Sequence, residues 1–213
     1  MSGTGASGDS GTDAALIGHS LVDPECFSMI VERHGTSVFR YLTSRVGRTS
    51  SEDLFADVFE AAFRTRERYD LRYDNALPWL LGIATNVVRH HRRSEGRRAS
   101  MVRRVTQLHR PGLGPSESVD TVVAGAEAND ELHQVRRALS SLDDNHRDVL
   151  VLSAGLGLSY EDIARALGLK VGTVRSRLSR ARRRLRELLE TPGQYSTDDG
   201  SDQRSPVSEE NPR

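Results

Sequence analysis

Residues 158–178 read LSYEDIARALGLKVGTVRSRL and carry the pattern of two short helices joined by a tight turn. Ser159 followed three residues later by Asp162 is typical of a helix start, and Gly168 suits the end of that helix. Val174 and Leu178 then return at helical spacing, so they face the core together. The stretch predicts a helix-turn-helix, a motif that lays its second helix in the major groove of DNA.

The outer side of that second helix is polar and basic. We expect it to bind DNA through Arg175, Ser176, Arg177, Ser179, Arg180 and Arg183. A helix stabilised by its own surface ion pairs would need acidic partners, and only Glu187 and Glu190, at its far end, are available. Residues in its first turns should meet base edges, whereas Arg183, further along, should meet phosphates.

An earlier block of the chain has the same helical periodicity. Apolar residues recur at helical spacing in residues 27–42, 52–68 and 78–93, and no sustained alternation indicates a strand. Ser50 resembles the first residue of a capping box for the second of these segments, and Asn75 suits the cap of the third. The sequence therefore predicts an all-α protein, and this block is expected to be a four-helix domain.

Composition divides the chain into five parts. Two tails, residues 1–24 and 191–213, are rich in Gly, Ser, Pro and acidic residues and are predicted to be disordered. A similar stretch makes residues 99–130 a flexible acidic linker. Two small helical domains remain, 25–98 and 131–190.

Charge and cysteine content exclude several classes of protein. The net charge is zero, but basic residues gather inside the two domains, and all but one of the 30 are arginine. Cys26 is the single cysteine, so neither an internal disulfide nor a multi-thiolate metal site is possible. No apolar run is long enough to span a membrane, which predicts a cytoplasmic protein without membrane insertion.

Enzyme chemistry has no residues to support it. No catalytic triad, paired carboxylates or Gly-rich phosphate loop occurs, so neither an enzyme nor a cofactor is expected. His90 and His91 are adjacent, and neighbours on a helix point about 100° apart, so they cannot chelate one metal ion together. We therefore expect no metal site.

Four motifs together resemble one family. They are EDLFADVF at 52–59, PWLLGIATN at 78–86 with Arg92 and Arg93, LSYEDIA at 158–164 and VGTVRSR at 171–177. In this order, across a linker, they resemble the extracytoplasmic-function (ECF) group of bacterial RNA polymerase sigma factors. The match spans about residues 25–190.

The resemblance implies a division of labour between the domains. The first would resemble sigma region 2 and read the −10 promoter element, and the second would resemble region 4 and read the −35 element. For the −10 element the implied residues are Tyr69, Asp70, Arg72, Asn75, Trp79, Asn86, Arg89, Arg92 and Arg93. The irregular loop at 69–75, together with Asn86, should hold unstacked bases of one strand.

The resemblance also implies the partners. Core RNA polymerase would be bound at its β′ clamp and β flap, the clamp contact being made by Asp53, Leu54, Asp57, Val58 and Phe59. We expect Asp53, Asp57 and Phe59 to be partly exposed for this purpose. The acidic linker would follow the RNA exit path, where it can mimic RNA. An anti-sigma factor is a further expected partner.

Two other classes of protein are alternatives. A stand-alone helix-turn-helix regulator would dimerise on palindromic DNA and bind it without polymerase. An enzyme acting on nucleic acid would need catalytic residues that the chain does not offer. Binding to core polymerase, followed by run-off transcription, discriminates among the three.

Overall fold

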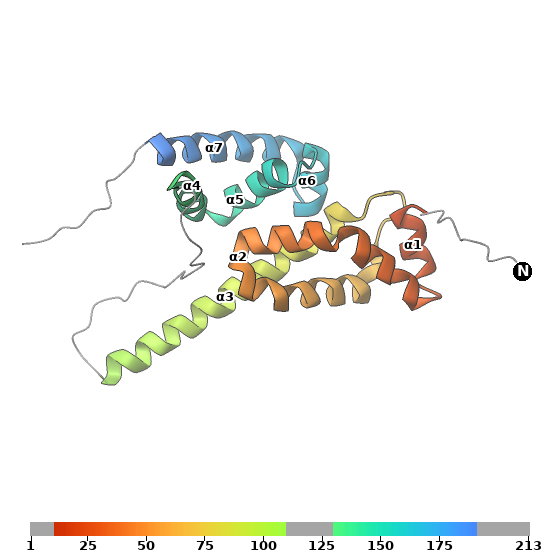
Figure 1. The fold of residues 1–213 in the computed structure, drawn as a ribbon, viewed down its shortest axis with the longest axis horizontal. Coiled ribbons are helices and arrows are strands. Elements are labelled where there is room, and N and C mark those ends of the chain that lie inside the picture. The colour runs from red at the N-terminus through yellow and green to blue at the C-terminus, as the bar shows by residue number, and fades with distance from the viewer. Residues whose placement is uncertain (1–10, 110–129, 191–213) are drawn as a thin grey trace, which may run out of the picture.

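The computed structural model describes residues 11–109 and 130–190. Within these ranges every regular element is a helix, as the sequence predicts, and the helices form two groups that lie against each other (Figure 1). The first group comprises α1 (Asp13–His19), η1 (Pro24–Phe27), α2 (Ser28–Thr65), η2 (Arg66–Arg68) and α3 (Leu77–His109). The second comprises α4 (Asp130–Ser140), α5 (Asp144–Leu150), the π-helical turn η3 (Val151–Gly155), α6 (Tyr160–Leu167) and α7 (Val171–Glu190).

Helix α2 folds back on itself at Gly47. This residue has φ 76° and ψ 173°, a conformation that glycine adopts without the steric cost a side chain would add. The two arms of α2 then pack together, and the rings of Phe39 and Phe55 meet edge to face with their centroids 6.0 Å apart. The sequence predicts the break at Ser50, but Ser50 lies inside the second arm because Gly47 has already reversed the chain.

Each domain has its own apolar core. The first is built between α2 and α3 by Val38, Tyr41, Leu42, Val58, Leu80, Leu81, Ala84 and Val88, all fully buried. The second is built by Val149, Leu152, Ile163, Val174, Leu178 and Ala181. Full burial of one large aliphatic side chain contributes about 1.5–3 kcal/mol, so these helices are held mainly by packing.

The predicted disordered tail at 1–24 is wrong for its second half. Residues 13–19 form α1, and the Thr12 side chain caps the helix by accepting a hydrogen bond from the backbone N–H of Ala15 at 3.3 Å. Leu16 and Ile17 are buried against the first domain. The Gly and Ser content of residues 2–8 obscured this short apolar stripe. Residues 1–10 lie outside the described residues.

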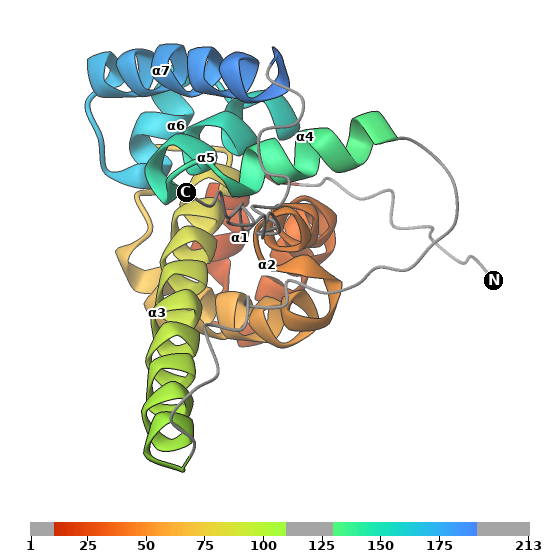
Figure 2. The ribbon, with the colours of Figure 1, turned by 90° about the vertical axis from the view of Figure 1, so that its left-hand side faces the viewer.

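The predicted linker begins too early. Helix α3 does not end at residue 98 but continues to His109, and its last turns extend away from both domains (Figure 2). No glycine or proline interrupts residues 99–109, and the first helix breaker is Pro111. The rest of the expected linker, and the tail at 191–213, lie outside the described residues.

The two domains share an interface. Helix α6 packs on α3, and η3 packs on α2, so the apolar cluster runs from one domain into the other. Among the described residues, no helix is long and apolar enough to cross a membrane. The interface decides which surfaces of each domain remain open.

Candidate nucleic-acid interface

The helix-turn-helix forms through the local signals that predict it. Ser159 precedes α6, and its Oγ accepts a hydrogen bond from the backbone N–H of Asp162 at 3.1 Å. Gly168 ends α6 in the left-handed conformation, and the backbone N–H of Leu169 donates to the carbonyl of Ala164 at 2.8 Å. Helix α7 then begins at Val171, which fixes its direction relative to α6.

Helix α7 has one buried and one open face. Val174, Leu178 and Ala181 are buried, as predicted. The residues predicted to meet DNA lie on the other side: Arg175, Ser176, Ser179, Arg180 and Arg183 are exposed, and Arg177 is half-buried. In the part of the chain that the structure describes, neither Arg175 nor Arg180 has a salt bridge to a carboxylate.

Acidic partners are confined to the far end of α7. Nε of Arg183 lies 3.7 Å from Oε1 of Glu187, and Nη1 of Arg184 lies 3.2 Å from its Oε2. The guanidinium groups in the first turns are therefore available for base edges or phosphates.

The loop before α3 is more ordered than the sequence indicates. The Asn75 side chain accepts the backbone N–H of Leu77 at 2.9 Å, which agrees with its predicted capping role. Arg72 is exposed and Asp70 is half-buried; the two pair with each other, and hydrogen bonds from Arg72 lower the pKa of Asp70 to about 2. The two side chains thus form a neutral pair at the loop surface.

Tyr69 is not exposed to DNA in this conformation. Its ring is buried, lies 5.0 Å from the ring of half-buried Trp79, and its hydroxyl donates to the carbonyl of Tyr73. Burial and the nearby charge of Asp13 raise its pKa to about 12. The prediction that Tyr69 holds a base is corrected: its ring supports the loop, and Tyr73, 41% exposed, is the aromatic side chain that the loop presents.

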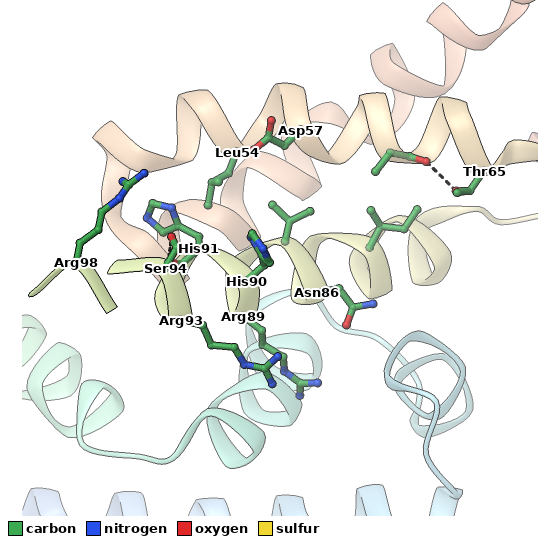
Figure 3. A pocket seen from close by; sticks show the side chains of 13 residues that line it. Leu54, Asp57, Thr65, Asn86, Arg89, His90, His91, Arg93, Ser94 and Arg98 are labelled. Atoms are coloured by element: carbon green, nitrogen blue, oxygen red, sulfur yellow. Dashed lines mark hydrogen bonds between the residues drawn. The ribbon is translucent and has the colours of Figure 1, made fainter. Parts of the chain in front are cut away.

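The basic face of α3 is partly covered by the second domain. Arg89 donates from Nη2 to Oδ2 of Asp148 at 2.9 Å, and Arg92 pairs with Asp144. Figure 3 shows Arg89 and Arg93 reaching towards the second domain. Two of the predicted −10 arginines therefore already have anionic partners, whereas Asn86 and Arg93 are exposed.

A groove of about 760 Å³ lies on the surface between the second arm of α2 and α3. Asp57 approaches it from α2, while His90 and Arg98 approach it from α3 (Figure 3). The groove thus brings part of the predicted polymerase-binding set beside part of the predicted −10 set. Among the described residues, no three His, Cys, Asp or Glu side chains are grouped closely enough to hold a metal ion.

The predicted polymerase-binding set divides into two classes. Asp53 and Asp57 are exposed on the second arm of α2, as expected. Leu54, Val58 and Phe59 belong to the core, and Phe59 is only 8% exposed, with its ring 4.9 Å from that of Phe55. The expectation that Phe59 is partly exposed is wrong, because the fold of α2 at Gly47 covers it.

Sequence reasoning missed residues whose partners lie far along the chain. Asp13, inside the supposed tail, accepts a hydrogen bond from the loop before α3. The Thr12 cap before Ala14, Leu16 and Ile17 is a signal that could have revealed its helix. Arg45 and Asp148 form a buried pair between the domains, their closest atoms 2.9 Å apart. No sequence pattern links two residues from separate domains in this way.

Comparisons with known proteins cover both domains. The family model described as "Sigma-70 region 2" matches residues 30–98, and "Sigma-70, region 4" matches residues 132–185. The RNA polymerase sigma factor CnrH of Cupriavidus metallidurans is 32% identical over 178 residues, which cover 77% of this chain and 86% of that protein. The ECF RNA polymerase sigma factor SigC of Mycobacterium tuberculosis is 29% identical over 177 residues, covering 83% of this chain and 90% of the relative.

A solved structure has a similar fold. It is the sigma factor RpoE in complex with the anti-sigma factor NepR from Bartonella quintana. Its TM-score is 0.58 at 26% identity, and the match covers 78% of this chain and 98% of that chain.

Proposed function

Because this chain belongs to the ECF group of bacterial RNA polymerase sigma factors, we propose that its two domains divide promoter recognition between them. Helix α7 reads the −35 element as duplex DNA. Helix α3 and the loop at 69–76 read the −10 element as it opens. Core polymerase brings both contacts to one promoter.

The open face of α7 is the observation that carries this proposal. Arg175, Ser176, Ser179 and Arg180 are exposed together in the first half of a helix that a capped helix-turn-helix holds in place. Arginine can donate two parallel hydrogen bonds to the major-groove edge of guanine. Arg183 lies further along and is placed for phosphate contact, which holds the helix in register without reading sequence.

The −10 contact is supported by the side chains that remain open on the first domain. Asn86 offers an amide that can hydrogen-bond a base, and Arg93, about two turns further along α3, offers a positive charge. Tyr73 in the loop supplies an exposed ring, and stacking on an aromatic ring is a sequence-tolerant way to hold an unpaired base. We assign base contact to Asn86 and Tyr73 and backbone contact to Arg93.

The polymerase contact is assigned to the exposed acidic residues of α2. Asp53 and Asp57 lie one helical turn apart and project from the same side of the second arm. They would bind the β′ clamp, and the buried Leu54, Val58 and Phe59 would hold the arm rigid behind them. The second domain would contact the β flap.

Regulation by an anti-sigma factor is supported by the relative from Bartonella quintana, which was solved in complex with one. Since core polymerase is cytoplasmic, we place the chain in the cytoplasm.

Run-off transcription tests the proposed function. Core polymerase and the chain are incubated with a promoter library randomised at the −35 and −10 positions, and RNA starts are sequenced. Defined starts should require both proteins and both elements. A chain that binds palindromic duplex without polymerase, and gives no transcripts with core, would instead be a helix-turn-helix regulator.

A further inference from the structure

The carboxylate of Asp13 joins α1 to the loop before α3. Oδ2 accepts a hydrogen bond from the backbone N–H of Ala76 at 2.8 Å and lies 2.6 Å from Nε2 of His34. Oδ1 accepts from Nη1 of Arg33 at 2.9 Å. The backbone N–H of Asp13 also donates to the carbonyl of Asp74 at 3.1 Å. Both the side chain and the backbone of Asp13 therefore hold the last residues of the loop.

These bonds are shielded from water. Asp13 is 4% exposed, and although burial opposes its ionisation, the hydrogen bonds from Ala76, His34 and Arg33 hold its pKa below the usual value. The loop is thus held at its end by bonds that water does not reach.

We propose that Asp13 is a positioning residue for −10 recognition: it fixes the loop at 69–76 in the shape that presents Tyr73 and Asn75 to DNA. The inference rests on the proposed function of this loop. Asp13 is itself buried and acts through the bonds to Ala76 and Asp74.

The test compares two substitutions in α1. Asp13→Ala removes the acceptor for Ala76, whereas Ile17→Ala removes fully buried apolar contacts of the same helix and leaves that acceptor in place. Initiation rates with core polymerase are measured on promoters that share one −35 element and differ at single −10 positions. Asp13→Ala should bring the rate ratios between preferred and substituted −10 elements towards one, while Ile17→Ala should lower the melting temperature and keep the ratios.

Asp13→Asn keeps an oxygen acceptor for Ala76 and should restore most of the discrimination even if Asp13→Ala folds poorly. Equal ratios for Asp13→Ala and the wild-type chain would overturn the inference. The inference would also be overturned if Ile17→Ala lost as much −10 discrimination as Asp13→Ala at the same loss of melting temperature. If the wild-type chain shows no dependence on −10 sequence, the proposed function of the loop fails as well.

Discussion

The outer face of α7 and the basic face of α3 are both rich in arginine, yet only the first is open. Arg175 and Arg180 on α7 are exposed, whereas Arg89 and Arg92 on α3 keep about a third of their side-chain surface and hold the carboxylates of α5. Arginine content alone does not distinguish the two faces. The difference arises because the second domain covers one of them.

The contrast has an energetic basis. Burying a carboxylate such as Asp148 is costly, and its bonds to arginine largely offset that cost, so the contact between the domains adds little net stability. DNA phosphates can therefore replace the carboxylates of such an interface without a large loss of free energy. The open face of α7 needs no such exchange, and we expect −35 contact to precede −10 contact.

The largest effect is expected from substitutions at the proposed polymerase contact, which lies outside both DNA-reading faces. Asp53→Lys together with Asp57→Lys should abolish binding to core polymerase, because it reverses two charges on the proposed contact surface, and promoter recognition through both faces should then be lost. Binding is measured by size-exclusion co-elution with core polymerase, and the fold by circular dichroism. Glu32→Lys, on the exposed side of the first arm, is the control. Unchanged core affinity in the double variant would refute the assignment.

Truncating one core residue of the second domain should change DNA binding by α7 and DNA binding by α3 in opposite directions. Leu178 is 1% exposed, and Leu178→Ala should cost the second domain about 2–5 kcal/mol in free energy of unfolding. Binding to −35 duplex should fall. Binding of the free chain to a single-stranded −10 oligonucleotide should rise, because the carboxylates of α5 no longer hold Arg89 and Arg92. Fluorescence anisotropy measures both affinities.

The matched control is Leu80→Ala in the core of the first domain, where Leu80 is fully buried. It should weaken −10 binding and spare −35 binding. If both variants lower both affinities equally, the domains unfold as one unit and the two faces cannot be separated.

On the open face, Arg180→Ala should cost about 1–3 kcal/mol at one base pair of the −35 element and relax the preference there. Stability should change little, since an exposed side chain of this kind contributes within about 0.5 kcal/mol. Binding isotherms on −35 duplexes that differ at each position measure the effect. A uniform loss across all duplexes would place Arg180 on phosphate instead.

What the sequence predicts correctly depends on neighbouring residues. The Ser159 cap, the Gly168 end and the Val174 and Leu178 stripe all act within a few residues, and the helix-turn-helix follows from them. The two-domain, all-helical fold and the family follow from the same kind of signal.

What the sequence does not predict depends on contacts across the chain. Phe59 and Tyr69 lie in suitable motifs, but the return of α2 at Gly47 buries the first and the packing of Trp79 buries the second. The contact between the domains involves Asp148 and Gly82, where an added Cβ would lie 2.4 Å from the carbonyl oxygen of Ala166, and these two residues share no sequence pattern. A motif match assigns a residue to a face of its helix, but it does not tell which neighbour covers that face.

The smallest effect is expected further along the same open helix. Arg183 has an exposed side chain, and its Nε lies 3.7 Å from the carboxylate of Glu187. Because an exposed ion pair contributes little free energy, a phosphate can replace Glu187 as its partner at little cost. Arg183→Ala should weaken all −35 duplexes alike and lower the slope of log affinity against log salt by about 0.9, the value for one phosphate contact. Isotherms at four salt concentrations on preferred and substituted duplexes measure slope and selectivity together. A change in base preference with an unchanged slope would show that Arg183 reads sequence, and the proposed division along α7 would then be wrong.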